Sequence, residues 1–282
     1  MAQGPGCDRM VPQKLSFRNV STKSKLAAQA LSAGYSADHV IQNLDLEISQ
    51  GSVTAIIGPN GAGKTSLLKA LARKIPAASG AVLLDGISIT SLTKAEINQS
   101  IGFLAAIPAA RNQESVFDLV ARSAMAARQI SRVSPRLKEE IETLLERTSL
   151  TGVRDKKVGE LSSGYRQCAV IAAALVKNPA VLLLDEPTNS LDYSHQLQVM
   201  NLLSSLKRER GMTVVAVIHD LNLAARFADH IVILKDGSIV AQGTPHEVIT
   251  PNNLADAFRI LARVIDDPVG KTPLVIPIRQ LA

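Results

Sequence analysis

The sequence predicts an α/β fold in which a mainly parallel sheet carries helices on both faces. An apolar run at Val53–Ile57 leads into a glycine-rich loop and then into a helical pattern. Further continuous apolar runs return at Val181–Leu184, Thr213–Ile218 and Ile231–Leu234, with helical stretches between them. Continuous rather than alternating apolar runs are typical of strands buried on both faces, as in parallel sheets.

The elements ahead of this sheet have a different pattern. Lys25–Tyr35 and Val40–Ile48 alternate in character, so we expect a small antiparallel layer. Val82–Ser88 is expected to form a hairpin around Asp85-Gly86. Near the other end of the chain, Lys235-Asp236-Gly237 indicates a turn into Ser238–Gly243, which would close the sheet with a second hairpin.

A helical insertion is expected between the strands. Apolar residues recur at helical spacing over Val116–Ile130, and Pro135 is a typical first residue for a helix over Arg136–Leu150. The insertion is expected to cover about residues 106–163 of a domain spanning 25–260. Residues 1–24 would form a flexible arm, and residues 261–282 an extended tail.

Composition limits the classes of protein that remain. No apolar stretch approaches the roughly 20 residues of a membrane span, so any membrane role is expected to be peripheral. Cys7 and Cys168 are too few for a disulfide framework. Most of the formal net charge of +6 comes from the first 25 residues. The body of the domain is nearly neutral, and we therefore expect no nucleic-acid partner.

The glycine-rich loop matches the P-loop pattern G-x-x-x-x-G-K-[ST]. In this loop, backbone N–H groups and the following helix N-terminus attract phosphate. Lys64 is expected to contact the β- and γ-phosphates, and Thr65 to offer its hydroxyl to Mg²⁺. A glycine turn with a chance Lys-Thr is the alternative, but the strand before the loop and the helix after it favour nucleotide binding. The binding loop comprises Gly58, Pro59, Asn60, Gly61, Ala62, Gly63, Lys64, Thr65 and Ser66.

Three later segments carry further polar side chains. Asp185 and Glu186 end the Val181–Leu184 strand, where an Asp can hold Mg²⁺ and a second carboxylate can act as a general base. A solvated turn is the alternative. Leu161–Gln167 has the features of a helix N-terminus that displays hydrogen-bond donors, which could form a second anion site. An ordinary capped helix start is the alternative. His219 follows the Thr213–Ile218 strand, and a structural histidine is the alternative there.

Taken together, these motifs resemble the ATP-binding cassette (ABC) ATPases over about residues 25–259. Leu161–Tyr165 resembles the signature of that family, Asp185-Glu186 its Walker B end and Ser190-Leu191-Asp192 its D-loop. The resemblance implies a RecA-like P-loop NTPase core with an antiparallel layer and an inserted helical subdomain.

The resemblance also implies roles for single residues. Tyr35 would stack on adenine, and Ser162 and Gly164 would contact the γ-phosphate of a partner subunit's ATP. Glu186 would activate water, with His219 and Lys64 as the other catalytic groups. Asp192 would lie at the nucleotide, and Thr65 and Asp185 would hold Mg²⁺. Two subunits would pair head to tail, each ATP lying between one P-loop and the partner's signature.

Other segments resemble the importer ATPases for ferric siderophores, haem and cobalamin. They are Leu191-Asp192 with His195-Gln196, the stretch His219–His230, Gly243-Thr244-Pro245 with Glu247-Val248, and the ending Asp266–Pro277. The resemblance implies a peripheral subunit on the cytoplasmic face of the membrane. Its partners would be permease subunits, a second ATPase subunit and, indirectly, an extracytoplasmic substrate-binding protein.

The sequence departs from the family at two places. Ala106 takes the position of a Gln that meets Mg²⁺ or water in relatives, and slow hydrolysis is therefore expected. In the signature, Ser163 and Tyr165 replace the usual Gly and Gln, a variation that we expect to be tolerated. A regulatory subunit with weak hydrolysis, a soluble ABC ATPase outside transport and a small-molecule kinase are the alternatives to an importer motor.

Overall fold

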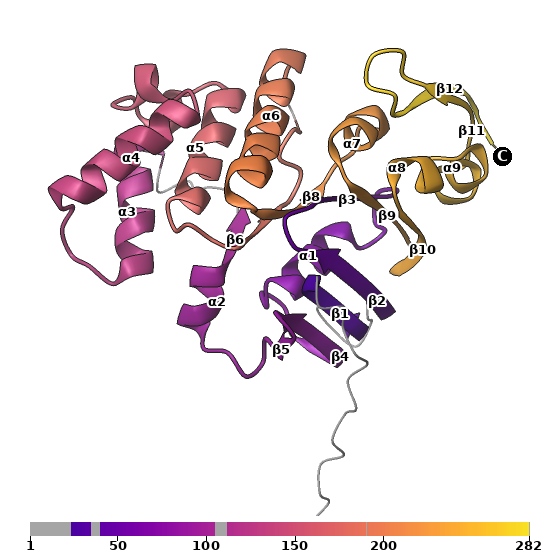
Figure 1. The fold of residues 1–282 in the computed structure, drawn as a ribbon, viewed down its shortest axis with the longest axis horizontal. Coiled ribbons are helices and arrows are strands. Elements are labelled where there is room, and N and C mark those ends of the chain that lie inside the picture. Colours follow the sequence, from indigo (N-terminus) through magenta and orange to yellow (C-terminus); the bar gives the residue numbers. More distant parts are fainter. Residues whose placement is uncertain (1–23, 35–39, 105–111, 190, 282) are drawn as a thin grey trace, which may run out of the picture.

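A six-stranded sheet in the order β10-β9-β3-β8-β7-β6 forms the centre of the molecule (Figure 1). The structure is a computed structural model that describes residues 24–34, 40–104, 112–189 and 191–281. Every neighbouring pair of strands is parallel except the antiparallel β9–β10 pair, so the expected parallel sheet and its closing hairpin are confirmed. The strands are β3 (Val53–Ile57), β6 (Ile101–Leu104), β7 (Val181–Leu184), β8 (Thr213–Val217), β9 (His230–Lys235) and β10 (Ser238–Gly243).

A four-stranded antiparallel sheet in the order β2-β1-β4-β5 lies beside it, as expected for the first part of the chain. Asp85 and Gly86 both have positive φ angles, of 50° and 77°, at the β4–β5 turn. Two successive positive φ angles are the mark of a tight hairpin turn, which Asp-Gly favours. The strands are β1 (Ser24–Ala33), β2 (Ile41–Ser49), β4 (Ala77–Leu84) and β5 (Ile87–Ser88).

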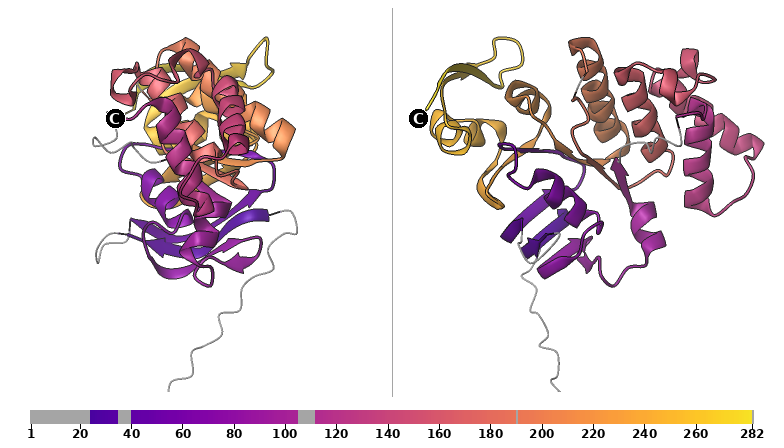
Figure 2. Two further views of the ribbon diagram at one scale, coloured as in Figure 1. Left: turned by 90° about the vertical axis from the view of Figure 1, so that its left-hand side faces the viewer. Right: turned by 180° about the vertical axis from the view of Figure 1, so that it is seen from behind.

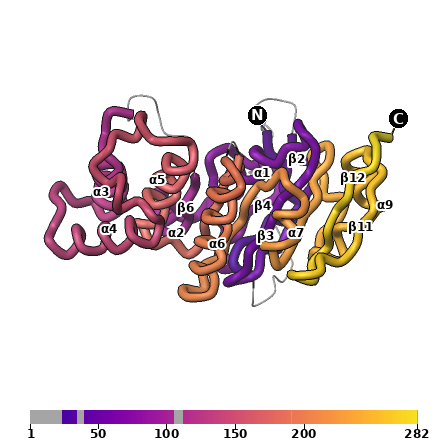
Figure 3. Tube along the Cα trace, turned by 90° about the horizontal axis from the view of Figure 1, so that it is seen from above, coloured from indigo at the N-terminus to yellow at the C-terminus, as the bar shows by residue number. Residues whose placement is uncertain are grey.

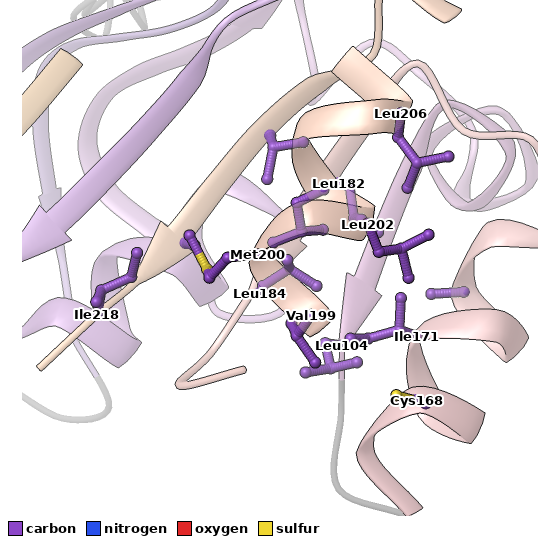
Figure 4. Packing of buried hydrophobic residues seen from close by; sticks show 14 of the residues in the cluster. Leu104, Cys168, Ile171, Leu182, Leu184, Val199, Met200, Leu202, Leu206 and Ile218 are labelled. Atoms are coloured by element: carbon purple, nitrogen blue, oxygen red, sulfur yellow. The ribbon is translucent and has the colours of Figure 1, made fainter. Parts of the chain in front are cut away.

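Two hydrophobic clusters cover the two faces of the central sheet. On β7, Leu182 and Leu184 pack with α5 and α6, as Figure 4 shows. The alternate residues Val181 and Leu183 belong to the other cluster, with α1 and the antiparallel sheet. The α-helices are α1 (Lys64–Leu71), α2 (Lys94–Ser100), α3 (Val116–Arg128), α4 (Pro135–Arg147), α5 (Ser163–Leu175), α6 (Tyr193–Arg210), α7 (Leu221–Phe227), α8 (Pro245–Val248) and α9 (Pro251–Phe258). Short 3-10 turns occupy Thr151–Val153 and Val158–Glu160.

Helices α3, α4 and α5 gather at one end of the elongated molecule (Figure 3). The α3 and α4 helices are each shorter than the sequence pattern predicts. At the end of α3, Gln129 takes a left-handed backbone with φ 53°, so Ile130 falls outside the helix. Thr148 likewise ends α4 ahead of Leu150. Among the described residues, no helix is both long and apolar enough to cross a membrane.

The C-terminal residues form a hairpin at the opposite end of the molecule (Figure 2). Strands β11 (Ile260–Asp266) and β12 (Pro273–Gln280) pair antiparallel. Val275 is buried, and its N–H donates to Asn222 Oδ1 at 2.7 Å while Asn222 Nδ2 donates to its carbonyl at 3.2 Å. The segment expected as an extended tail is therefore a strand that is fastened to α7.

Candidate functional site

The topology brings three chain segments to one edge of the central sheet. The P-loop follows β3, His219 comes just after β8, and Asp185 and Glu186 follow β7. Because β8 pairs in parallel with both β3 and β7, the carboxyl ends of all three strands face the same way. The carboxyl edge of a parallel sheet is the usual ligand-binding edge of such folds.

The turn of the P-loop into α1 depends on Gly63. This residue precedes the helix with φ 96°, a left-handed conformation that side chains rarely adopt. A Cβ atom at this position would also lie 2.9 Å from Ile41 Cδ1. The loop is fixed from within by Ala62 N–H donating to the Pro59 carbonyl at 3.3 Å, and from β9–β10 by Gly237 N–H donating to the Ala62 carbonyl at 3.1 Å. These two hydrogen bonds thus fix the conformation of the loop, and Gly63 has no side chain to cover its backbone.

Lys64 is a nearly buried cation at the bottom of this loop. Its side chain donates from Nζ to the carbonyls of Gly58 at 2.9 Å and Pro59 at 2.8 Å. Burial lowers the pKa of Lys64, and the negative charges of Glu186 and Asp185 oppose that shift. A buried ammonium held only by neutral carbonyls gains from any anion that enters the loop.

Thr65 and Asp185 join the two strand ends directly. Thr65 Oγ1 donates to Asp185 Oδ1 at 3.1 Å. Burial raises the pKa of Asp185, and the bond from Thr65 opposes the shift. The pair offers a hydroxyl and a carboxylate oxygen side by side, which is the donor chemistry that Mg²⁺ prefers.

Glu186 contacts two further side chains. His219 Nε2 lies 2.7 Å from Glu186 Oε1, and Asn189 Nδ2 donates to Glu186 Oε2 at 2.8 Å. The hydrogen bond from His219 is the main cause that lowers the pKa of Glu186. Glu186 also has a left-handed backbone with φ 50°, an uncommon conformation for a residue other than glycine. Asn189 was not predicted from the sequence.

Two cavities meet at Glu186. One, of about 260 Å³, lies over the P-loop, and the other, of about 120 Å³, extends toward the end of β8. The first is lined by Val40, Asn60, Gly61, Gly63, Lys64, Thr65, Ser66 and Glu186. The second is lined by Glu186, Thr188, Asn189, Gln196, His219 and Asp220.

The signature segment forms the start of α5. Ser162 caps the helix, with the N–H of Tyr165 donating to its Oγ at 3.5 Å. Arg166 holds the preceding loop through bonds to the carbonyls of Val158, Gly159 and Leu161. No residue of Ser162–Tyr165 is among the described residues that line the P-loop cavity. Within one chain, the signature and the P-loop therefore do not form a common site.

Asp192 and the residues after it form the first turn of α6. The N–H of His195 donates to Asp192 Oδ1 at 2.9 Å, and His195 Nδ1 lies 2.9 Å from both carboxylate oxygens. The backbone bond and then the side-chain bond from His195 lower the pKa of Asp192. Gln196 Nε2 donates to the carbonyls of Thr188 at 3.4 Å and Leu191 at 3.1 Å. The sequence suggested no role for His195 or Gln196, although Asp-x-x-His has the spacing of a helix cap.

Three residues of the sequence-based hypotheses lie outside the described residues. They are Tyr35, expected at the adenine, Ala106, expected at the position of the family's Gln, and Ser190 of the D-loop. The P-loop, Asp185, Glu186 and His219 do come together, as their strand positions require.

The fold and this edge define a P-loop nucleotide-binding protein with an ABC-type cassette. Residues 41–189 match the family described as "ABC transporter", which is more than half of the chain. The chain belongs to this family.

Curated relatives match nearly the whole length. The chain is 41% identical to the ferric enterobactin transport ATP-binding protein FepC of Escherichia coli, over 92% of this chain and 96% of the relative. It is 38% identical to the probable siderophore transport system ATP-binding protein YusV of Bacillus subtilis, covering 90% and 93%. It is 36% identical to the hemin import ATP-binding protein HmuV of Rhodopseudomonas palustris, covering 89% and 94%.

Solved structures support the same fold. A dimeric ATP-binding cassette in a post-hydrolysis state with ADP and Pi superposes with a TM-score of 0.69 at 28% identity, covering 78% of this chain and 98% of the other. An inward-facing metal-chelate type ABC transporter has a TM-score of 0.78 at 24% identity, covering 91% and 98%. The second likeness concerns the fold alone.

Proposed function

We propose that this chain is the ATP-binding and ATP-hydrolysing motor subunit of an importer for a ferric siderophore or a related metal chelate. One observation carries the proposal. The cavity over the P-loop is bordered by Lys64 on one side and by Glu186, in contact with His219, on the other. A phosphate-binding loop and a carboxylate next to a histidine at one strand edge fit hydrolysis of a nucleoside triphosphate better than binding alone.

The residues at this edge fit ATP and Mg²⁺. Gly61 and Gly63 line the cavity over the loop, where no side chain of theirs separates the backbone N–H groups from an incoming phosphate. Lys64 would exchange its carbonyl partners for phosphate oxygens, and Thr65 and Asp185 would hold the metal ion. Mg²⁺, when bound, supplies positive charge that offsets the charge of the phosphates.

The catalytic step would depend on Glu186 and His219. The Glu186 carboxylate is ionised at neutral pH and can accept a proton from a water molecule, although the hydrogen bond from His219 that lowers its pKa also makes it a weaker base. One of its oxygens now bonds to His219 and the other to Asn189. Each oxygen can accept a further hydrogen bond from water, and release of the bond from His219 would make the carboxylate a stronger base. His219 would then be available to orient the terminal phosphate.

A second copy of the chain would complete the site. Ser162 is exposed and displays its hydroxyl at the start of α5, away from the P-loop cavity of its own chain. In a head-to-tail dimer, Ser162 and Gly164 of one copy would face the nucleotide of the other. That the similar cassette bound to ADP and Pi is dimeric supports a dimer for this chain.

The substrate class and the membrane partners rest on the relatives. The two relatives named for iron chelate transport and the one named for hemin import share the length of this chain. We infer a permease as the direct partner, an extracytoplasmic binding protein as an indirect one, and a peripheral position on the cytoplasmic face of the membrane.

A regulatory subunit with weak hydrolysis is the second candidate. Only Ala106 favours it, because a methyl group can neither coordinate Mg²⁺ nor hydrogen-bond water. The side chains of Lys64, Asp185, Glu186 and His219 all argue against an inactive site.

Purification from native membranes tests the proposal. The tagged chain would be isolated in mild detergent, and the proteins that accompany it identified by mass spectrometry. We expect a permease with many membrane-spanning helices, together with ATPase activity that Glu186→Gln abolishes. Ribosomes, nucleic acid or the absence of any membrane protein in the purified material would contradict the proposal.

A further inference from the structure

His195 lies between two segments that the proposed function assigns to different tasks. Its Nδ1 lies within 2.9 Å of both carboxylate oxygens of Asp192. A carboxylate only accepts hydrogen bonds, so Nδ1 carries the proton and donates. The side chain is 26% exposed, which leaves most of the ring packed against protein.

The other side of the ring fills the space beside Gly164 in the signature. A Cβ atom at Gly164 would lie 2.3 Å from His195 Cδ2 and 2.5 Å from its Cγ. Real Cβ contacts are never this short, so the imidazole occupies the volume of the missing side chain. Tyr165 packs against the same ring, with centroids 5.8 Å apart and planes at 75°. An edge-to-face pair of this kind is a favourable contact.

The next residue of α6 connects this contact to the catalytic carboxylate. Gln196 Nε2 donates to the carbonyl of Leu191 in the D-loop and to the carbonyl of Thr188, on the segment between Walker B and the D-loop. In that segment Asn189 donates to Glu186 at 2.8 Å. The first turn of α6 therefore touches the start of α5 on one side and the surroundings of Glu186 on the other.

We propose that His195 is a positioning residue that ties the signature glycine Gly164 to Asp192 of the D-loop. This proposal rests on the proposed function. The signature of one copy engages the partner's nucleotide, whereas the Walker B segment serves the copy's own nucleotide. A fixed link through His195 makes these two segments move together, so engagement at one site of the dimer is transmitted to the other. Gly164 is then required by its own chain as well as by the partner's phosphate.

Three single variants separate the hydrogen bond from the packing. His195→Phe keeps a ring of similar size but loses the donor to Asp192. His195→Asn keeps an N–H donor near the position of Nδ1 and loses the ring. Asn201→Ala, at an exposed position of the same helix, is the matched control.

Steady-state ATPase kinetics and equilibrium binding of a fluorescent ATP analogue give the first test. We expect His195→Phe to lower kcat about tenfold, the worth of one hydrogen bond to a charged group, with KM and analogue affinity unchanged. His195→Asn should also lower kcat, because it keeps the donor but loses the ring that contacts Gly164, whereas Asn201→Ala should retain all of it. A wild-type kcat in either His195→Phe or His195→Asn would overturn the proposal.

A double-mutant cycle in thermal unfolding gives a test that needs no activity. Gly164→Ala should lower Tm in the wild-type background and much less in the His195→Ala background, because the ring is no longer there to clash. Additive changes in Tm would overturn the packing half of the proposal. Absence of ATPase activity in the wild type would instead count against the proposed function, while the unfolding cycle would still decide the contact.

Discussion

The P-loop edge and the signature end of the molecule differ in how their polar groups are satisfied. At the P-loop edge, polar side chains that follow separate strands contact one another beside a cavity: Thr65 donates to Asp185, and His219 lies against Glu186. At the signature end, Ser162 is an exposed helix cap, and the carboxylate of Asp192 is held by His195. The P-loop edge thus has its polar groups already in contact with one another, whereas the signature end presents an exposed hydroxyl.

Under the proposed function, this difference would make hydrolysis depend on assembly. Residues that hold phosphate and activate water must be fixed precisely, and the candidates for these roles lie at the ends of buried strands. The donors that we propose to complete a partner's site lie at a helix start, outside the lining of the P-loop cavity of their own chain. Variants in the two regions should consequently fail in different ways.

Glu186→Gln should give the largest effect. Removing a general base costs about 10²–10⁴-fold in rate, and the amide keeps the size of the side chain and its contact with Asn189. Phosphate release under saturating MgATP would measure the loss. Glu139→Gln, at an exposed position on α4, is the control. Substantial turnover in the Glu186→Gln protein would show that another group is the general base.

Lys64→Ala should separate binding from catalysis. Loss of a hydrogen-bonding cation is expected to weaken MgATP binding roughly tenfold to a hundredfold. Calorimetric titration of the purified chain would measure the affinity, with Lys138→Ala on α4 as the control. Unchanged affinity would mean that the loop backbone alone holds the phosphates.

Ser162→Ala should act on the rate and leave binding to the isolated chain unchanged. If the hydroxyl serves the partner's site, as we propose, kcat should fall about tenfold. The lost cap should cost only about 0.5 kcal/mol of unfolding free energy, since its bond to Tyr165 N–H is long at 3.5 Å. A change in the nucleotide affinity of monomeric protein would break the proposed division between the two regions.

Ala106→Gln should have the smallest effect, and its direction is the informative part. A Gln amide can hydrogen-bond the water that a methyl group cannot, so basal ATPase turnover should rise. Ala106→Asn, with the same chemistry and a shorter reach, is the control. Unchanged or lower turnover in the Gln variant would show that Ala106 does not limit hydrolysis.

The P-loop edge could largely be predicted from the sequence because its parts follow buried strands. Val53–Ile57 and Val181–Leu184 stand in the structure with the bounds that the apolar runs predict. Helix ends were less accurate, since α3 ends at Arg128 and α4 at Arg147, short of the expected Ile130 and Leu150. The α5 helix begins at Ser163 after its cap Ser162, within the segment Leu161–Gln167 that the sequence indicated as a helix N-terminus.

The contacts of His195 and the C-terminal hairpin could not be predicted in the same way. The position of the His195 ring beside Gly164 depends on how α5 and α6 pack, and no local sequence pattern determines how close these two residues lie. Likewise, residues 273–280 have the composition of an extended tail, and only the partners Ile260–Asp266 and Asn222 make them a strand. The roles of Ser162, Gly164, Asp192 and the other site residues stay predictions.

The fastening of the hairpin to α7 has a practical consequence. Asn222 lies just after His219, and its two bonds to Val275 fix β12 to the start of that helix. Val269, in the turn of the hairpin, is 82% exposed. A fluorophore attached at Val269 would be connected through β12 and Asn222 to the start of α7, close to His219. Movement of the loop that contains His219 during turnover should therefore change the fluorescence, without a label near the nucleotide.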